Sequence, residues 1–209
     1  MKRIMVFLLM VLVIPGMVFA GVTRKVIDKY PDVSRGDLTL PGQPKTVIYL
    51  DSKGKEIAKE LYNEEGIILE TTGKIPDGIV KEYFDSGKLL AEYNYKNGKL
   101  DGRSMGYYES GILRGEWNYK AGKMDGVVKA YDDKGDLTYE MTYKDDVLNG
   151  LGKYYRDGTL FYDWQFMDGK KEGISRRYYK DGKIQLEETY KDGKVVSAKK
   201  YDRKGDLVK

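Results

Sequence analysis

Five acidic residues recur at one position of a repeating pattern, 23 or 24 residues apart: Glu92, Glu116, Glu140, Asp163 and Glu187. Carboxylates in such numbers could bind a metal ion or transfer protons. If each lies on its own β-hairpin, however, neighbouring acids are about 9.6 Å apart, because each strand adds about 4.8 Å. That distance is too long for two acids to share a metal ion or to act as an acid–base pair. We therefore expect each acid to pair with a basic residue of a neighbouring strand, the candidates being Lys81, Lys129, Lys153 and Arg176.

The sequence contains no His and no Cys among its 209 residues. Without these side chains there can be no zinc site of the His/Cys type, no disulfide, no cysteine nucleophile and no histidine general base. The glycine-rich turns are not followed by a helix, which a phosphate-binding loop requires. We therefore expect no catalytic residue, no metal site and no cofactor, and an enzymatic function is the least favoured class.

The acids belong to a repeat that fills most of the chain. Seven copies of Tyr-x-x-x-Gly follow one another at steps of 21 to 24 residues. The residues predicted to shape the repeat are Tyr83, Tyr107, Tyr131, Tyr154 and Tyr178 with Gly87, Gly111, Gly135, Gly158 and Gly182. The glycines would supply the positive φ of tight turns, and each tyrosine ring would cover the next unit while its hydroxyl reaches a turn carbonyl. We expect the tyrosines to stabilise the fold more than the acids do.

Each copy predicts a β-hairpin, because short aromatic segments alternate with Asp-Gly, Asn-Gly or Ser-Gly turns. In the second strand of one copy, Ala91, Tyr93 and Tyr95 would face one side, whereas Glu92 and Asn94 would face the other. No helical periodicity follows Gly78 to cover the apolar side. The sequence therefore predicts an all-β fold: residues 48–209 form an elongated, curled single antiparallel sheet of tandem hairpins that bury their apolar side by stacking.

Aromatic residues provide the candidate binding surface. Those at the period-two positions, such as Trp117 and Trp164, are expected to pack inside the curl. A second set directly follows the repeat tyrosines and so points to the opposite side from them: Phe84, Tyr108, Tyr155 and Tyr179. Rings left exposed in a row suit a peptide, a glycan or a partner protein.

Residues 1–20 have the pattern of a signal peptide. Lys2 and Arg3 precede an apolar run over 4–14, and Val18-Phe19-Ala20 forms a small-residue cleavage site. The apolar run is shorter than the roughly 20 residues that a membrane-spanning helix needs. We expect export to the periplasm or the cell exterior, with membrane contact only through an uncleaved signal. Residues 21–47, which lack the repeat, are predicted to form an irregular linker or cap.

Charge gives little reason to expect nucleic-acid binding. Removing Lys2 and Arg3 leaves 35 basic and 33 acidic residues, a net charge of +2 with no evident basic cluster. The mature chain is expected to be a monomer.

The residues carry a family resemblance. Gly115-Glu116-Trp117 followed by Gly122-Lys123-Met124-Asp125-Gly126 resembles the MORN repeat, and the prevailing Tyr-x-x-x-Gly-x-Leu-x-x-Glu-x-x-Tyr-Lys-x-Gly-Lys form is similar to its bacterial variant. The resemblance covers roughly residues 49–209. It implies a tandem-hairpin sheet used for binding, and some bacterial relatives are labelled antitoxins.

Two functions follow as expectations. The first is an exported, non-enzymatic protein whose extended β surface binds a protein or another cell-envelope component. The alternative is an antitoxin or immunity protein that neutralises a cognate toxin.

Overall fold

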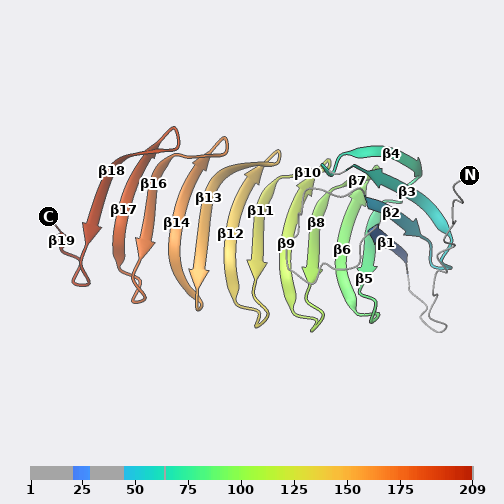
Figure 1. The fold of residues 1–209 in the computed structure, drawn as a ribbon, viewed down its shortest axis with the longest axis horizontal. Coiled ribbons are helices and arrows are strands. Elements are labelled where there is room, and N and C mark those ends of the chain that lie inside the picture. The colour runs from blue at the N-terminus through green and yellow to red at the C-terminus, as the bar shows by residue number, and fades with distance from the viewer. Residues whose placement is uncertain (1–20, 29–44, 64, 209) are drawn as a thin grey trace, which may run out of the picture.

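The computed structural model describes residues 21–28, 45–63 and 65–208, and every regular element among them is a β-strand (Figure 1). These residues include no apolar helix of membrane-spanning length. The predicted signal peptide, residues 1–20, lies outside the described residues. The strands are β1 (Val22–Asp28), β2 (Lys45–Leu50), β3 (Glu56–Tyr62), β4 (Ile68–Gly73), β5 (Gly78–Tyr83), β6 (Leu89–Lys96), β7 (Lys99–Leu100), β8 (Gly102–Tyr107), β9 (Leu113–Lys120), β10 (Lys123–Met124), β11 (Gly126–Tyr131), β12 (Leu137–Lys144), β13 (Val147–Arg156), β14 (Thr159–Met167), β15 (Lys170–Lys171), β16 (Gly173–Tyr178), β17 (Ile184–Lys191), β18 (Lys194–Tyr201) and β19 (Leu207–Val208).

All strands belong to one elongated sheet. The long strands follow one another in the order β4-β3-β2-β1-β5-β6-β8-β9-β11-β12-β13-β14-β16-β17-β18-β19, and β7, β10 and β15 are short extensions paired to β6, β9 and β14. The predicted all-β sheet of tandem hairpins is confirmed. It differs from the prediction in one pairing, because β1 and β5 are parallel and the sheet is therefore mixed.

Strand β1 falls in the stretch predicted to be an irregular linker or cap. Its Thr23 lies between Leu50 of β2 and Lys81 of β5. Sequence patterns missed β1 because it carries no repeat motif and its partner strands are distant in the sequence. This part of the stretch is a regular strand that joins the first hairpins to the array. Residues 29–44 lie outside the described residues.

Two turn types alternate along the ribbon. One is a tight turn with positive φ at both central positions, as at Asn97-Gly98 and Asp192-Gly193, which matches the twist of antiparallel strands. The other is longer and contains Gly87, Gly111, Gly135 or Gly182. All five repeat glycines have positive φ, but Gly158 lies in a tight Asp157-Gly158 turn of the first type. At Gly87, for example, the backbone N–H donates to the carbonyl of Phe84 at 2.8 Å, and a register shift between Glu82 and Tyr83 accommodates the extra residue.

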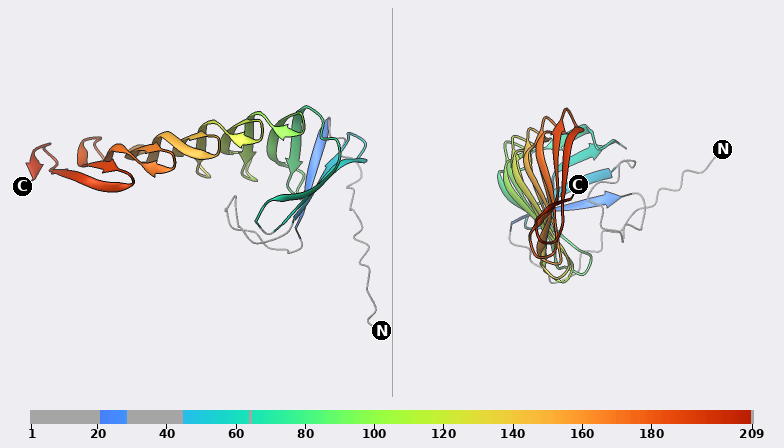
Figure 2. Two further views of the ribbon diagram at one scale, coloured as in Figure 1. Left: turned by 90° about the horizontal axis from the view of Figure 1, so that it is seen from above. Right: turned by 90° about the vertical axis from the view of Figure 1, so that its left-hand side faces the viewer.

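The fully buried hydrophobic core lies at the N-terminal end. Val47, Tyr49 and Ala58 from the first hairpin pack against Val80 and Tyr95 of the array. Seen along the array, the strands bow into an arc, and β1–β4 cross its open side (Figure 2). Strands β1–β4 do not reach the later hairpins, so the described part of the array from β8 onward is a single layer.

Candidate binding surface

The two faces of the array differ in chemistry. We call the side that carries the five recurring acids the acidic face. The opposite side, here called the aromatic face, carries a column of large side chains: Tyr93, Trp117, Met141 and Trp164. Strands β1–β4 pack against this aromatic face at its N-terminal end.

The acidic face is held together by ion pairs between neighbouring strands. Lys81 pairs with Glu92 and Lys153 with Glu140, each at 3.2 Å, as predicted. Arg176 also pairs with its predicted neighbours, at 3.1 Å from Glu187 and 4.0 Å from Asp163. The ion pair of Glu116 is formed by Arg103 at 2.8 Å and not by Lys129.

Tyrosine hydroxyls complete these clusters. Repeat tyrosines donate their hydroxyls back to the acid of the preceding hairpin, with Tyr131 donating to Glu116 at 3.1 Å and Tyr178 to Asp163 at 2.6 Å. The predicted contact with a turn carbonyl is therefore wrong at these positions. Burial, and then the hydrogen bond to Asp163, raise the pKa of the Tyr178 hydroxyl to about 12. The acids and tyrosines form one structural network.

The four predicted surface aromatics are half-buried, not exposed: Phe84, Tyr108, Tyr155 and Tyr179. Tyr108 donates its hydroxyl to the carbonyl of Tyr131, and Tyr179 donates to that of Tyr201, both at 2.8 Å. These two rings thus bridge one hairpin to the next. The turn-carbonyl role expected of the repeat tyrosines belongs to their neighbours.

Strand β13 breaks the repeat by a single position. In the other hairpins the repeat tyrosine pairs with the Leu or Ile that opens the next strand, as Tyr131 does with Leu137. In β13 the residue that pairs with the corresponding Leu160 is Tyr155, because the Asp157-Gly158 turn is shorter. The prediction that Tyr154 is the tyrosine opposite this Leu is therefore wrong by one residue. Tyr155 takes that position, and Tyr154 moves to the aromatic face.

The displaced Tyr154 completes a continuous row of rings, which we call the aromatic track. Its ring centroid lies 4.8 Å from that of Tyr139 and 6.1 Å from that of Phe161. The row continues from Phe161 to Tyr162 at 4.8 Å and to Trp164 at 5.2 Å, the last two rings being nearly parallel. Small residues occupy the Tyr154 position in two other hairpins, Gly106 and Ala130. The spacing of the sequence motif did not predict the track, because the one residue that this hairpin lacks relative to the others is lost from its turn.

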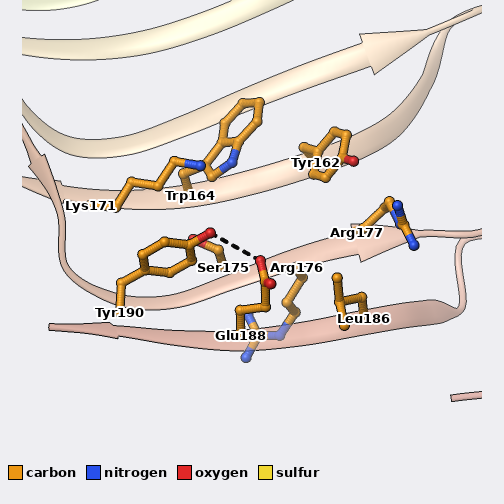
Figure 3. A pocket seen from close by; sticks show the side chains of 9 residues that line it. All are labelled: Tyr162, Trp164, Lys171, Ser175, Arg176, Arg177, Leu186, Glu188 and Tyr190. Atoms are coloured by element: carbon orange, nitrogen blue, oxygen red, sulfur yellow. Dashed lines mark hydrogen bonds between the residues drawn. The ribbon is translucent and has the colours of Figure 1, made fainter. Parts of the chain in front are cut away.

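A cavity of about 240 Å³ adjoins the end of the aromatic track (Figure 3). At one end of the cavity, Lys171 lies over Trp164, with its Nζ 5.4 Å from the ring centroid. Arg177 lies at the opposite end of the cavity. Glu188 stands where the other hairpins place a large apolar side chain, and it accepts a hydrogen bond from Tyr190 at 3.0 Å. Arg176, which is ion-paired with Glu187, also lines the cavity, so the site combines three cations, one acid and several rings.

A model of the MORN repeat variant matches residues 76–97, 100–121, 124–145 and 171–192. Each matched segment contains one hairpin described above: β5–β6, β8–β9, β11–β12 and β16–β17. Residues 76–192 contain four MORN repeat variants. Repeats of this family are generally a non-catalytic module, which points to a repeat-based binding protein. No curated protein matches the chain.

The MORN repeat variant does not match residues 146–170. This segment contains β13 and β14, the hairpin with the shortened turn and most of the aromatic track. The repeat that departs from the family pattern is therefore the one that adds rings to the aromatic face.

Proposed function

We propose that the chain is an exported, non-enzymatic MORN repeat variant protein that binds a protein or another cell-envelope component on its aromatic face. The signal-peptide pattern of residues 1–20 supports export. The family supports a binding role.

The observation that carries the choice of face is the aromatic track. Its rings lie in contact along the open, single-layer part of the array, and Tyr139 at its start is 43% exposed. Aromatic side chains offer a large contact area at low cost in conformational entropy. On the opposite face the recurring acids already form ion pairs and hydrogen bonds with Lys, Arg and Tyr side chains. Fewer polar groups are therefore free to bind a partner there.

The test compares two exposed apolar residues on adjacent strands and opposite faces. Tyr139 of β12 lies on the aromatic face, and Leu151 of β13, 39% exposed, lies on the acidic face. The mature chain is immobilised and exposed to envelope extract, and the captured proteins are quantified by mass spectrometry. Tyr139→Lys should reduce capture of the specific partner at least tenfold, whereas Leu151→Lys should retain it.

Equal capture by both variants would contradict the proposal, and so would selective loss with Leu151→Lys. Circular dichroism of both variants confirms that each is folded before capture is compared.

A further inference from the structure

Charge is unevenly distributed along the array. Residues 170–209 contain 13 Lys and Arg but 7 Asp and Glu, a net charge of +6. Residues 49–169 contain 17 Lys and Arg and 23 Asp and Glu, a net charge of −6. The balanced total that argued against a basic cluster conceals this asymmetry. The cavity at the end of the aromatic track lies in the basic segment and its border with the acidic one.

Two cations of the cavity are not neutralised within the described chain. Lys171 Nζ lies 5.4 Å from the Trp164 ring centroid and 5.0 Å from that of Tyr190, and it forms no ion pair with a described carboxylate. Arg177 forms no ion pair there either, and its buried Nε has no hydrogen-bond partner. Among the described residues that line the cavity, Glu188 is the only acid. The lining therefore has an excess of positive charge and an unused donor.

Ser175 supplies a second unused polar group. It is 5% exposed, lines the cavity, and its Oγ has no hydrogen-bond partner in the described chain. Ser104 holds the same position in β8 and is also buried without a partner for its hydroxyl among the residues described. The serine alone is thus a feature of the repeat, and the two unpaired cations distinguish the cavity.

We propose that this cavity binds an acidic peptide segment of a partner protein through two of its carboxylates, with an aromatic or apolar residue of the same segment packed on the aromatic track. The proposal rests on the proposed function and specifies its ligand chemistry. Lys171 pairs with Phe166 and Arg177 with Tyr162, four residues apart along β14, so each cation provides the charge for a different carboxylate. Ser175 lies between them and provides a hydrogen bond. A peptide fits better than a free anion because the cavity opens onto the row of rings that ends at Tyr162 and Trp164.

Tryptophan fluorescence can report on the site directly. The chain has two tryptophans, so Trp117→Phe leaves Trp164 as the only one. The probes are a synthetic peptide of alternating Glu and Tyr, the same peptide with Gln in place of Glu, and sodium glutarate as a free dicarboxylate. The charge variants Lys171→Gln and Arg177→Gln are compared with Lys170→Gln, which removes the same charge from an exposed neighbour.

The Glu/Tyr peptide should change Trp164 emission saturably, and the Gln/Tyr peptide should bind at least tenfold more weakly. Lys171→Gln and Arg177→Gln should each weaken binding at least tenfold, Lys170→Gln less than twofold, and Glu188→Gln should strengthen it. Three results would overturn the proposal: equal weakening by all three charge variants, equal binding of the two peptides, or tighter binding of glutarate than of the peptide. Absence of any saturable change would overturn it as well.

Failure here can be told apart from failure of the proposed function. If Tyr139→Lys abolishes capture of the envelope partner but Lys171→Gln does not, the aromatic face binds and the carboxylate site is wrong. If neither change affects capture, the proposed face itself is wrong.

Discussion

Tyrosine hydroxyls connect neighbouring hairpins in two ways. On the acidic face they donate to a carboxylate, as Tyr178 does to Asp163. At the turns their neighbours donate to a backbone carbonyl, as Tyr108 does to Tyr131. A hydrogen bond to a charged acceptor is the stronger of the two kinds. The stability of the array therefore depends on tyrosines and acids together, not on the tyrosines alone.

Tyr178→Phe should lower the free energy of unfolding at pH 7 by about 1 kcal/mol, because Asp163 loses its hydroxyl donor. Tyr139→Phe is the matched control, since the Tyr139 hydroxyl has no hydrogen-bond partner within the described chain, and it should change stability by less than about 0.5 kcal/mol. Urea denaturation followed by circular dichroism measures both. Equal destabilisation by the two changes would show that the Tyr178 hydroxyl contributes nothing specific.

The raised pKa of Tyr178 also predicts the direction of its pH dependence. The folded-state pKa of about 12 exceeds the unfolded value of about 10. The contribution of Tyr178 to stability is therefore complete below about pH 10 and is lost as the pH rises toward 12. The difference in unfolding free energy between wild type and Tyr178→Phe should shrink across this interval. A difference that grows with pH would contradict the assigned hydrogen bond.

At the scale of the hairpin, turn chemistry fixes the register. Ala121 occupies the first position of a tight turn with φ of 51°, where the equivalent turn has Asn97 at 52°. Asn tolerates this left-handed conformation better than Ala does. Ala121→Asn should therefore raise stability by about 0.5–1 kcal/mol, and the reciprocal Asn97→Ala should lower it by a similar amount. Thermal unfolding of both variants measures the effect, and a stabilising Asn97→Ala would contradict it.

Period-two alternation and turn glycines were enough to predict the hairpins, the two faces and most of the ion pairs, because each is encoded within one repeat and its neighbour. Strand β1 could not be predicted this way, since its neighbour β5 lies far along the chain. The aromatic track was also missed. A single deletion in a turn leaves the motif Tyr154-x-x-x-Gly158 intact while it moves Tyr154 to the other face, and only the strand register reveals the change.

At the scale of the whole molecule, stability and binding are separated along the ribbon. The buried hydrophobic residues gather where β1–β4 cover the aromatic face, whereas the aromatic track and the unpaired cations lie on the single-layer part of the array. A single layer leaves one face of the sheet available, and neighbouring hairpins must supply its stability. The arrangement favours a partner that lies along the aromatic face near the basic C-terminal end.

Hydroxyl-radical footprinting of the mature chain, alone and with its captured envelope partner, tests the binding face most directly. Peptide mass spectrometry reads the oxidation of individual side chains on both faces of the array. The partner should protect Tyr139, Tyr154 and Trp164 on the aromatic face at least threefold. Oxidation should stay unchanged at Leu151 and at Met105, which lies on the acidic face between Glu92 and Glu116. Protection of Leu151 and Met105 without protection of the aromatic track would contradict the assignment of the aromatic face as the binding surface.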